Sequence, residues 1–302
     1  MKSVLILVAL AAVAIADNVQ VVDSFVEAPS VFGYLTKYGI PEAERIRKAE
    51  EEYVRNPRIV GGLPAALGQY PHQAGLISDI VGANGRGVCG GSLISTSRVL
   101  TAAHCWFDGQ NQAWRFEVVL GSVLLFSGGT RMHTSAVVTH ANWNPNRIRN
   151  DIAIIYLPNP VSTSASIAPI ALPSGNELNQ NFAGVRAIAS GFGITRDGAG
   201  ISNNQFLSHV NLNVITNGVC SVAFPLVIQD SNICTSGVGG TSTCGGDSGG
   251  PLITQSNDRC NLLRICHGLR DRFSRCLRSR HILHELHQPA LTIIRLLSGL
   301  YM

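Results

Sequence analysis

The sequence is poor in charge, and above all in lysine. Only 14% of its 302 residues are charged, and lysine occurs only at Lys2, Lys37 and Lys48. Glycine, in contrast, occurs 31 times, and apolar residues make up 45% of the chain. Low charge with abundant glycine argues against a coiled coil or a disordered chain and favours a turn-rich globular protein. The length allows one large domain or two ordinary ones.

The net charge of +4 is unevenly distributed and does not indicate a nucleic-acid partner. From Arg259 onward there are eight arginines against Asp271 and Glu285, a net charge of +6, whereas everything before Arg259 carries −2. The basicity therefore belongs to one terminal segment and not to the chain as a whole. We expect no nucleic-acid partner.

The chain has no apolar run long enough to cross a membrane. The run from Val4 to Ile15 is shorter than the ~20 residues that a spanning helix needs. Lys2 precedes it and Ala14-Ile15-Ala16 follows it, a pattern that predicts a secretory signal peptide of residues 1–16. We expect a secreted, extracellular protein without a membrane anchor. Its eight cysteines are then disulfide candidates before they are metal ligands.

Residues 17–58 differ in character from the rest of the chain. The stretch from Pro41 to Arg55 is dense in charge and compatible with a helix, and Arg58 is followed by Ile59-Val-Gly-Gly. One interpretation is a linker between two domains. We favour an activation propeptide, cleaved after Arg58 to make Ile59 a new N-terminus, because Asp247 offers the new ammonium group a partner.

Short apolar segments, separated by glycine, asparagine and proline, fill the chain from Ile59 onward. They form one set up to about Pro173 and a second set from Ala183 to Ser248. No helical period persists, so the pattern predicts an all-β protein with two antiparallel sandwich or barrel units. The interface between two such units is a usual place for a functional site.

The segment from Thr243 to Pro251, TCGGDSGGP, is difficult to interpret as core packing. Its glycines allow a tight turn in which the amides of Gly246 and Ser248 could converge on a developing oxyanion. Ser248 is therefore a candidate nucleophile. A serine hydroxyl is weak without an adjacent base, so the rest of the chain should supply one.

His104, in TAAHC, and Asp151, in NDIA, could supply a base and an acid. Either residue alone has an ordinary structural explanation, since an isolated histidine is more often structural and an aspartate often caps a strand. Together with Ser248 they fit one catalytic arrangement, in which the serine is the nucleophile, the histidine is the general base and the aspartate orients the histidine.

Five segments, in this order, resemble the chymotrypsin family of secreted serine proteases, and most closely its insect digestive chymotrypsins and collagenase-like enzymes. They are IVGG from Ile59, CGGSLI from Cys89, TAAHC from Thr101, DIA from Asp151 and GDSGGPL from Gly246. The resemblance covers residues 59–254 of a protease domain spanning 59–302. It implies two six-stranded antiparallel β-barrels with the active site between them, and a serine-type endopeptidase made as a zymogen.

The resemblance also implies roles for particular residues. His104, Asp151 and Ser248 would form the catalytic triad, and the amides of Gly246 and Ser248 the oxyanion hole. After cleavage at Arg58, the ammonium of Ile59 would pair with Asp247 and order the oxyanion loop.

Specificity would be set by Ser242, six residues before the nucleophile. Its neutral side chain disfavours substrates with Arg or Lys and favours large apolar ones, as in chymotrypsin.

Two disulfides are implied, Cys89–Cys105 and Cys220–Cys234, while the partner of Cys244 stays open. No metal or cofactor is implied. The implied partners are protein substrates, an activating trypsin-like protease and proteinaceous inhibitors, for a monomer acting in digestion in a gut lumen.

Residues 255–302 depart from the family. A strand, a Ser-Trp-Gly segment, a Gly-Cys pair and a C-terminal helix should follow Thr254, but the chain gives arginine- and histidine-rich sequence instead. The HELH stretch from His284 lacks the HExxH spacing of a zinc site. One interpretation is a divergent basic tail. We favour a reading-frame shift near codons 254–258, because degenerate codons regrouped in a shifted frame allow a family-like C-terminus.

A shifted tail has two consequences. The second barrel should be incomplete, and Cys260, Cys266 and Cys276 should not be designed disulfide partners. The alternative to an active protease is then an inactive or misfolded homologue whose substrate pocket lacks its walls. Resequencing the transcript through codon 259 decides between the interpretations, since a continuous frame without an insertion or deletion excludes the shift.

Overall fold

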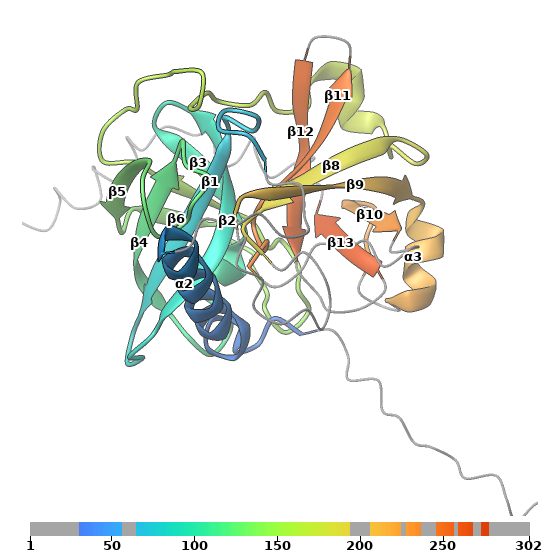
Figure 1. The fold of residues 1–302 in the computed structure, drawn as a ribbon. Coiled ribbons are helices and arrows are strands. Elements are labelled where there is room, and N and C mark those ends of the chain that lie inside the picture. The colour runs from blue at the N-terminus through green and yellow to red at the C-terminus, as the bar shows by residue number, and fades with distance from the viewer. Residues whose placement is uncertain are drawn as a thin grey trace, which may run out of the picture.

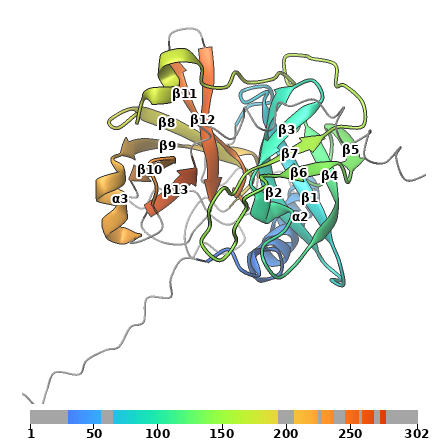
Figure 2. The same cartoon turned by 180° about the vertical axis from the view of Figure 1, so that it is seen from behind.

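The fold is described in a computed structural model for residues 30–55, 65–193, 206–224, 228–236, 246–256, 259–267 and 273–277. The expected signal peptide, residues 1–16, lies outside the described residues. Figures 1 and 2 show two β-sheets side by side, with one long helix, α2, lying on the first sheet. Among the described residues, no helix is both long enough and apolar enough to cross a membrane.

The first unit is a seven-stranded antiparallel sheet in the order β5-β4-β1-β2-β3-β7-β6. Its strands alternate with short turns, as the glycine-rich punctuation of the sequence predicts. The strands are β1 (Gln73–Ile80), β2 (Arg86–Ser95), β3 (Arg98–Thr101), β4 (Ala113–Leu120), β5 (Thr130–Thr134), β6 (Val137–Thr139) and β7 (Ala153–Tyr156).

The two edges of this sheet meet, so the sheet is curled. β5 and β6 stand at opposite ends of the strand order, yet only Ser135 and Ala136 separate them in the chain. The hydroxyl of Thr134 donates to the carbonyl of Tyr156 at 2.8 Å, and the Tyr156 amide donates to the Ala136 carbonyl at 2.8 Å. The expected six strands therefore appear as seven because one closing strand is bent into two.

The second unit is a closed six-stranded barrel in the order β10-β13-β12-β11-β8-β9. Its strands are β8 (Arg186–Gly191), β9 (Ser208–Ile215), β10 (Asn232–Ser236), β11 (Pro251–Ser256), β12 (Arg259–His267) and β13 (Phe273–Leu277). The helical elements are η2 (Leu35–Gly39), α2 (Ile40–Arg55), η3 (Ala103–Cys105), η4 (Gly175–Asn179) and α3 (Asn217–Ala223).

The closed barrel corrects the expectation that the second barrel is incomplete. β12 and β13 come from the departing tail, and they pair with β11 and β10 and with each other. Sheet hydrogen bonds are made by backbone groups. A segment whose side chains depart from the family pattern can therefore still supply the strands that close the barrel.

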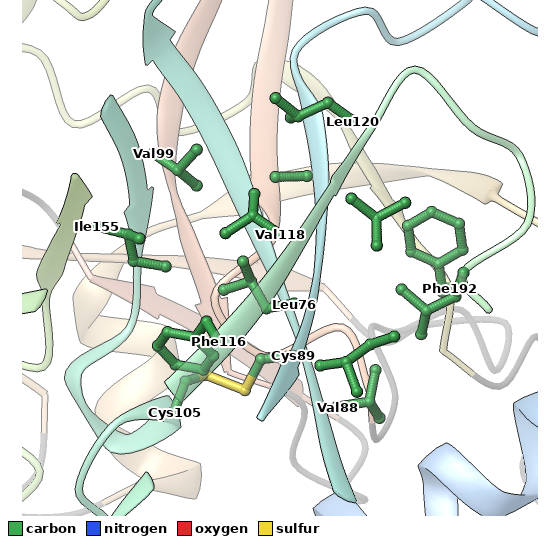
Figure 3. Packing of buried hydrophobic residues seen from close by; sticks show 14 of the residues in the cluster. Leu76, Val88, Cys89, Val99, Cys105, Phe116, Val118, Leu120, Ile155 and Phe192 are labelled. Atoms are coloured by element: carbon green, nitrogen blue, oxygen red, sulfur yellow. A yellow bond between two sulfur atoms is a disulfide. The ribbon is translucent and has the colours of Figure 1, made fainter. Parts of the chain in front are cut away.

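The main core fills the first unit and reaches the second. Figure 3 shows Leu76, Val88, Phe116 and Val118 packed together, with Phe192 of the second unit close by. At 25 cal/mol per Å² of buried apolar surface, each such side chain contributes roughly 2 kcal/mol. This core holds β1, β2 and β4 in place, and the candidate catalytic residues lie at the ends of neighbouring strands.

Helix α2 adds to the same core. The helix starts just after the π-helical turn η2, and its apolar residues recur at helical spacing on one face. The buried members of that face are Ala43, Ile46 and Ala49, and Leu35 of η2 is buried beside them. On the exposed face, Arg47 pairs with Glu44 at 2.9 Å and with Glu51 at 2.5 Å. The stretch that the sequence showed to be compatible with a helix is therefore helical, and it is docked on the first sheet.

Candidate active site

His104 and Asp151 are held together by two hydrogen bonds. His104 lies in η3, directly after β3, and Asp151 lies just before β7, the strand that pairs with β3. The imidazole Nδ1 is 2.7 Å from one carboxylate oxygen of Asp151, and the His104 backbone amide donates to the other oxygen at 2.8 Å. Both residues are 0% exposed. These two bonds fix the orientation of the imidazole ring.

Ser248 is brought to this pair by a close backbone contact between the two units. Its carbonyl accepts a hydrogen bond from the Gly90 amide of β2 at 2.7 Å. The Sγ of Cys105 lies 3.8 Å from the Nε2 of His104 and 3.6 Å from the Ser248 carbonyl oxygen. The nucleophile and base candidates therefore share a neighbour, although they come from different sheets.

Glycines make this contact possible. Gly249 has a φ of +81°, and a Cβ there would lie 2.3 Å from the Thr101 hydroxyl and 2.6 Å from the Gly90 carbonyl oxygen. A Cβ on Gly90 would lie 2.8 Å from the Cα of Gly250. A larger residue at any of these positions would push the Ser248 loop away from the first sheet.

Gly246 and Asp247 precede the serine and are both among the described residues. Gly246 has a φ of +91°, a conformation in which side chains are strained. The Asp247 carboxylate accepts a hydrogen bond from the Gly193 amide at 2.8 Å, and it packs so closely on Gly191 that a Cβ there would lie 2.1 Å from it. Ile59, its expected partner after cleavage, lies outside the described residues.

Two disulfides are present among the described residues, and both are the expected pairs. Cys89 of β2 is bonded to Cys105 beside the histidine, with a Cα–Cα distance of 6.2 Å. Cys220 of α3 is bonded to Cys234 of β10. The first one ties the short η3 turn to the central strand of the first sheet, which limits the movement of His104.

The site is covered by a residue that the sequence did not indicate, Tyr34. Its ring packs edge-on against the His104 ring with a centroid distance of 4.6 Å, and it is only 4% exposed. Burial raises the pKa of its hydroxyl to about 12, opposed by the nearby Ser248 side chain and Gly246 backbone. The Tyr34 ring therefore covers the candidate catalytic groups.

Glu42 of α2 covers the other part of the site. A Cβ placed on Gly246 would lie 2.9 Å from the Cγ of Glu42 and 3.3 Å from its Oε1. Arg45 donates to the Glu42 carboxylate at 2.9 Å. Tyr34 and Glu42 both belong to the segment whose apolar face packs against the first sheet, and that face follows from the amphipathic spacing of residues 35–50. That spacing could have shown that the helix has an apolar face in need of a partner.

Several expected residues cannot be placed. Arg58, Ile59, Ser242 and Cys244 lie outside the described residues. His104, Asp151 and Ser248 are brought together, and Gly246 and Asp247 adjoin them. Within the described residues the one group with metal-like spacing is Cys89, His104 and Cys105, and two of these are bonded as a disulfide. The arrangement places a buried serine near an imidazole that is held by a carboxylate.

Comparison with known proteins places this site in a family. The family model described as Trypsin matches residues 59–269, which extends beyond residue 254. The chain is 38% identical over 202 residues to the collagenase of Hypoderma lineatum, covering 66% of this chain and 73% of that protein. It is 40% identical over 200 residues to brachyurin of Leptuca pugilator, covering 64% and 80%.

A solved structure of HL collagenase superposes with a TM-score of 0.67 at 31% identity. The match covers 76% of this chain and 97% of that one. Nearly all of the solved fold therefore has a counterpart here, although about a quarter of this chain has none.

Proposed function

The chain belongs to the trypsin family of serine proteases, and we propose that it is a serine-type endopeptidase that is secreted as a zymogen. The observation that carries the proposal is the double hydrogen bond between His104 and Asp151 beside a buried Ser248. A carboxylate that accepts hydrogen bonds from both the backbone amide and the ring of a histidine is suited to fixing one tautomer of the ring. Membership of the family supplies the substrate class, the peptide bonds of proteins.

The proposed reaction uses these residues in turn. The Ser248 hydroxyl attacks the scissile carbonyl while His104 takes its proton, and the Asp151 carboxylate stabilises the resulting imidazolium. The amides of Gly246 and Ser248 receive the oxyanion. His104 then gives its proton to the leaving amine, and an acyl-enzyme remains. Water, deprotonated by His104, attacks this ester, and His104 returns the proton to the Ser248 oxygen as the acid leaves, so that the enzyme is restored without a metal or a cofactor.

Activation follows from cleavage after Arg58 by a trypsin-like protease. The ammonium of Ile59 would then approach Asp247, whose carboxylate accepts from the Gly193 amide before cleavage. Removing one member of a buried ion pair costs about 3–5 kcal/mol. Formation of this pair would couple the activation cleavage to the position of the loop that carries Gly246.

The finer specificity is also a proposal. Ser242 is neutral, so we expect cleavage after large apolar or aromatic residues and weak cleavage after Arg or Lys. A panel of peptide substrates that differ in this residue measures the preference. The extracellular location and the digestive role in a gut lumen rest on the expected signal peptide and on the family resemblance.

The competing proposal is an inactive homologue, and the departing tail favours it. The described backbone supplies β12 and β13, but the expected pocket-wall sequence after residue 254 is absent. An active-site label separates the two proposals, because it requires an activated serine and no particular substrate.

The experiment is labelling with a fluorophosphonate after cleavage at Arg58 and removal of the released propeptide. We expect one label per chain on Ser248, none in Ser248→Ala, and strongly slowed labelling in His104→Ala. Absence of labelling in the processed wild-type protein would establish the inactive alternative.

A further inference from the structure

Residues 30–55 contact the catalytic groups themselves. Tyr34 lies on the ring of His104 and beside the Ser248 side chain, and Glu42 lies against Gly246. With this cover in place, His104 is 0% exposed and Ser248 is 1% exposed. A substrate carbonyl must reach within about 3–3.5 Å of the attacking oxygen. In this conformation, the Tyr34 ring lies where that carbonyl would have to approach.

The start of the segment is anchored by polar contacts to the loop after η3. The buried Asp108 carboxylate accepts a hydrogen bond from the Leu35 amide at 2.8 Å. The side-chain amide of Asn111 donates to the Thr36 hydroxyl at 3.1 Å. Asp108 also accepts from the Asn111 amide at 2.7 Å, so the receiving loop is itself ordered. These bonds set the position of Tyr34, which directly precedes Leu35.

The rest of the segment is anchored by its apolar face and by its far end. Leu35, Ala43 and Ile46 belong to the main core of the first unit. Near the end of α2, the buried Glu50 carboxylate accepts hydrogen bonds from the amides of Leu125 and Phe126, the latter at 2.9 Å. The helix is therefore attached along its length by contacts that do not involve the Arg58 peptide bond.

The backbone conformation of this segment is not that of a bound substrate. Tyr34 has a helical backbone, with φ −51° and ψ −47°, and a helical turn follows it. Peptides that bind along a sheet edge do so in an extended conformation. The segment therefore blocks the site with a side chain, and its own peptide bonds are not laid out for attack.

We propose that residues 30–55 are an intrinsic inhibitor of this protease, which occludes the triad with Tyr34 and remains bound after the activation cleavage. Residues 17–58 contain no cysteine, so no disulfide can retain them, and residues 30–55 are held by packing and hydrogen bonds. Activation then has two steps, cleavage after Arg58 and dissociation of the released segment. This inference rests on the proposed function, since it presumes that Ser248 is reactive once uncovered.

The test compares full-length variants by the rate of fluorophosphonate labelling immediately after limited cleavage at Arg58, with the new N-terminus checked by sequencing. Tyr34→Ala removes the ring from His104. The matched control is Tyr38→Ala, which removes a tyrosine from the same segment at a position that is 49% exposed. We expect Tyr34→Ala to label about tenfold faster or more, as for truncation of a central interface aromatic, and Tyr38→Ala to label as the wild type does.

A second measurement does not depend on the folding of a variant. After cleavage, the wild-type protein is passed through a size-exclusion column, and we expect the released segment to co-elute with the protease domain. After separation under mild denaturation and refolding, labelling should reach one per chain. Immediate loss of the segment, or equal rates for wild type and Tyr34→Ala, overturns the inference while leaving the proposed function intact. Failure to label after removal of the segment overturns both.

Discussion

The two β units differ in what fills their cores, although both are curled antiparallel sheets. The core of the first unit includes Tyr34, Leu35 and Ile46 from the proposed propeptide. One separate apolar cluster in the second barrel consists of Ala187, Ala189, Leu212, Val214, Ile233 and Leu252, all from the barrel's own strands. The core of the histidine-bearing unit thus includes a segment that we propose is released, whereas this cluster of the serine-bearing unit does not.

This difference means that the geometry of His104 and Asp151 and the covering of the site depend on different contacts. His104 and Asp151 are fixed to each other by bonds within the first unit, so they should keep their geometry whether or not the segment is bound. Ser248 depends on glycine contacts across the interface between the units. Substitutions in the two units should therefore have separable effects, the largest of them at the catalytic acid.

Asp151→Asn should lower kcat by about four orders of magnitude, the effect that loss of this acid has in a serine protease triad. An amide can still contact the ring, but it favours the wrong tautomer of His104. Steady-state kinetics on the processed enzyme measures the change. An unchanged thermal midpoint would attribute the loss to chemistry, and a decrease of less than tenfold would exclude the assigned role of Asp151.

Gly249→Ala should lower kcat/KM by about a hundredfold, since a displacement of about 1 Å at a catalytic group has an effect of that size. The added Cβ would lie 2.3 Å from Thr101 Oγ1, which forces the Ser248 loop away from the first sheet. Gly82→Ala is the matched control, because Gly82 also has a positive φ, +71°, but nothing lies within 4 Å of its Cβ position. Equal activity losses in the two variants would show that backbone strain and not displacement is responsible.

Ile46→Ala and Leu212→Ala compare the two cores directly. Both side chains are buried, so each truncation should destabilise the uncleaved chain by about 2–5 kcal/mol, measured by denaturant unfolding. Only Ile46→Ala should also speed fluorophosphonate labelling after cleavage, because only Ile46 belongs to the inhibitory segment. Faster labelling in Leu212→Ala as well would mean that general loosening exposes the site.

Sequence patterns predicted the all-β class and the two units and were compatible with the helix Ile40–Arg55, because strand alternation and helix-forming residues are local properties. The neighbouring positions of His104, Asp151 and Ser248 followed from the motifs, and both described disulfides were the implied pairs. The cover formed by Tyr34 and Glu42 was not predicted, because it depends on where the helix docks. The completion of the barrel by β12 and β13 was missed because backbone pairing leaves little trace in side-chain patterns.

The smallest expected effect is a pH dependence of segment release through Glu50. Burial raises its pKa to about 7, from an ordinary 4.5, although the hydrogen bonds from the Phe126 and Leu125 amides and the charge of Arg131, itself paired with Glu117 at 2.6 Å, lower it. Between pH 4.5 and pH 7, Glu50 therefore carries a proton in the docked segment that it has lost in the released one. The stabilisation of docking by this proton is fully present below pH 4.5 and is lost as the pH rises through 7. Release should accelerate by roughly tenfold between pH 5 and pH 8.

The control for this prediction is Glu50→Gln, which retains the shape of the side chain but does not titrate. Its release rate, followed by size-exclusion chromatography of the cleaved protein, should be nearly independent of pH over the same range. A wild-type rate that is equally flat would show that Glu50 does not control docking.

The most direct test of the account is a burst titration with a chromogenic ester, performed on the cleaved protein before and after the propeptide is removed. Accumulation of an acyl-enzyme gives a rapid burst of product whose amplitude counts reactive serines. We predict a small burst before removal, a burst of one per chain after it, and none in Ser248→Ala. An absent burst after removal would contradict the assigned nucleophile, and a full burst before removal would contradict the inhibitory segment.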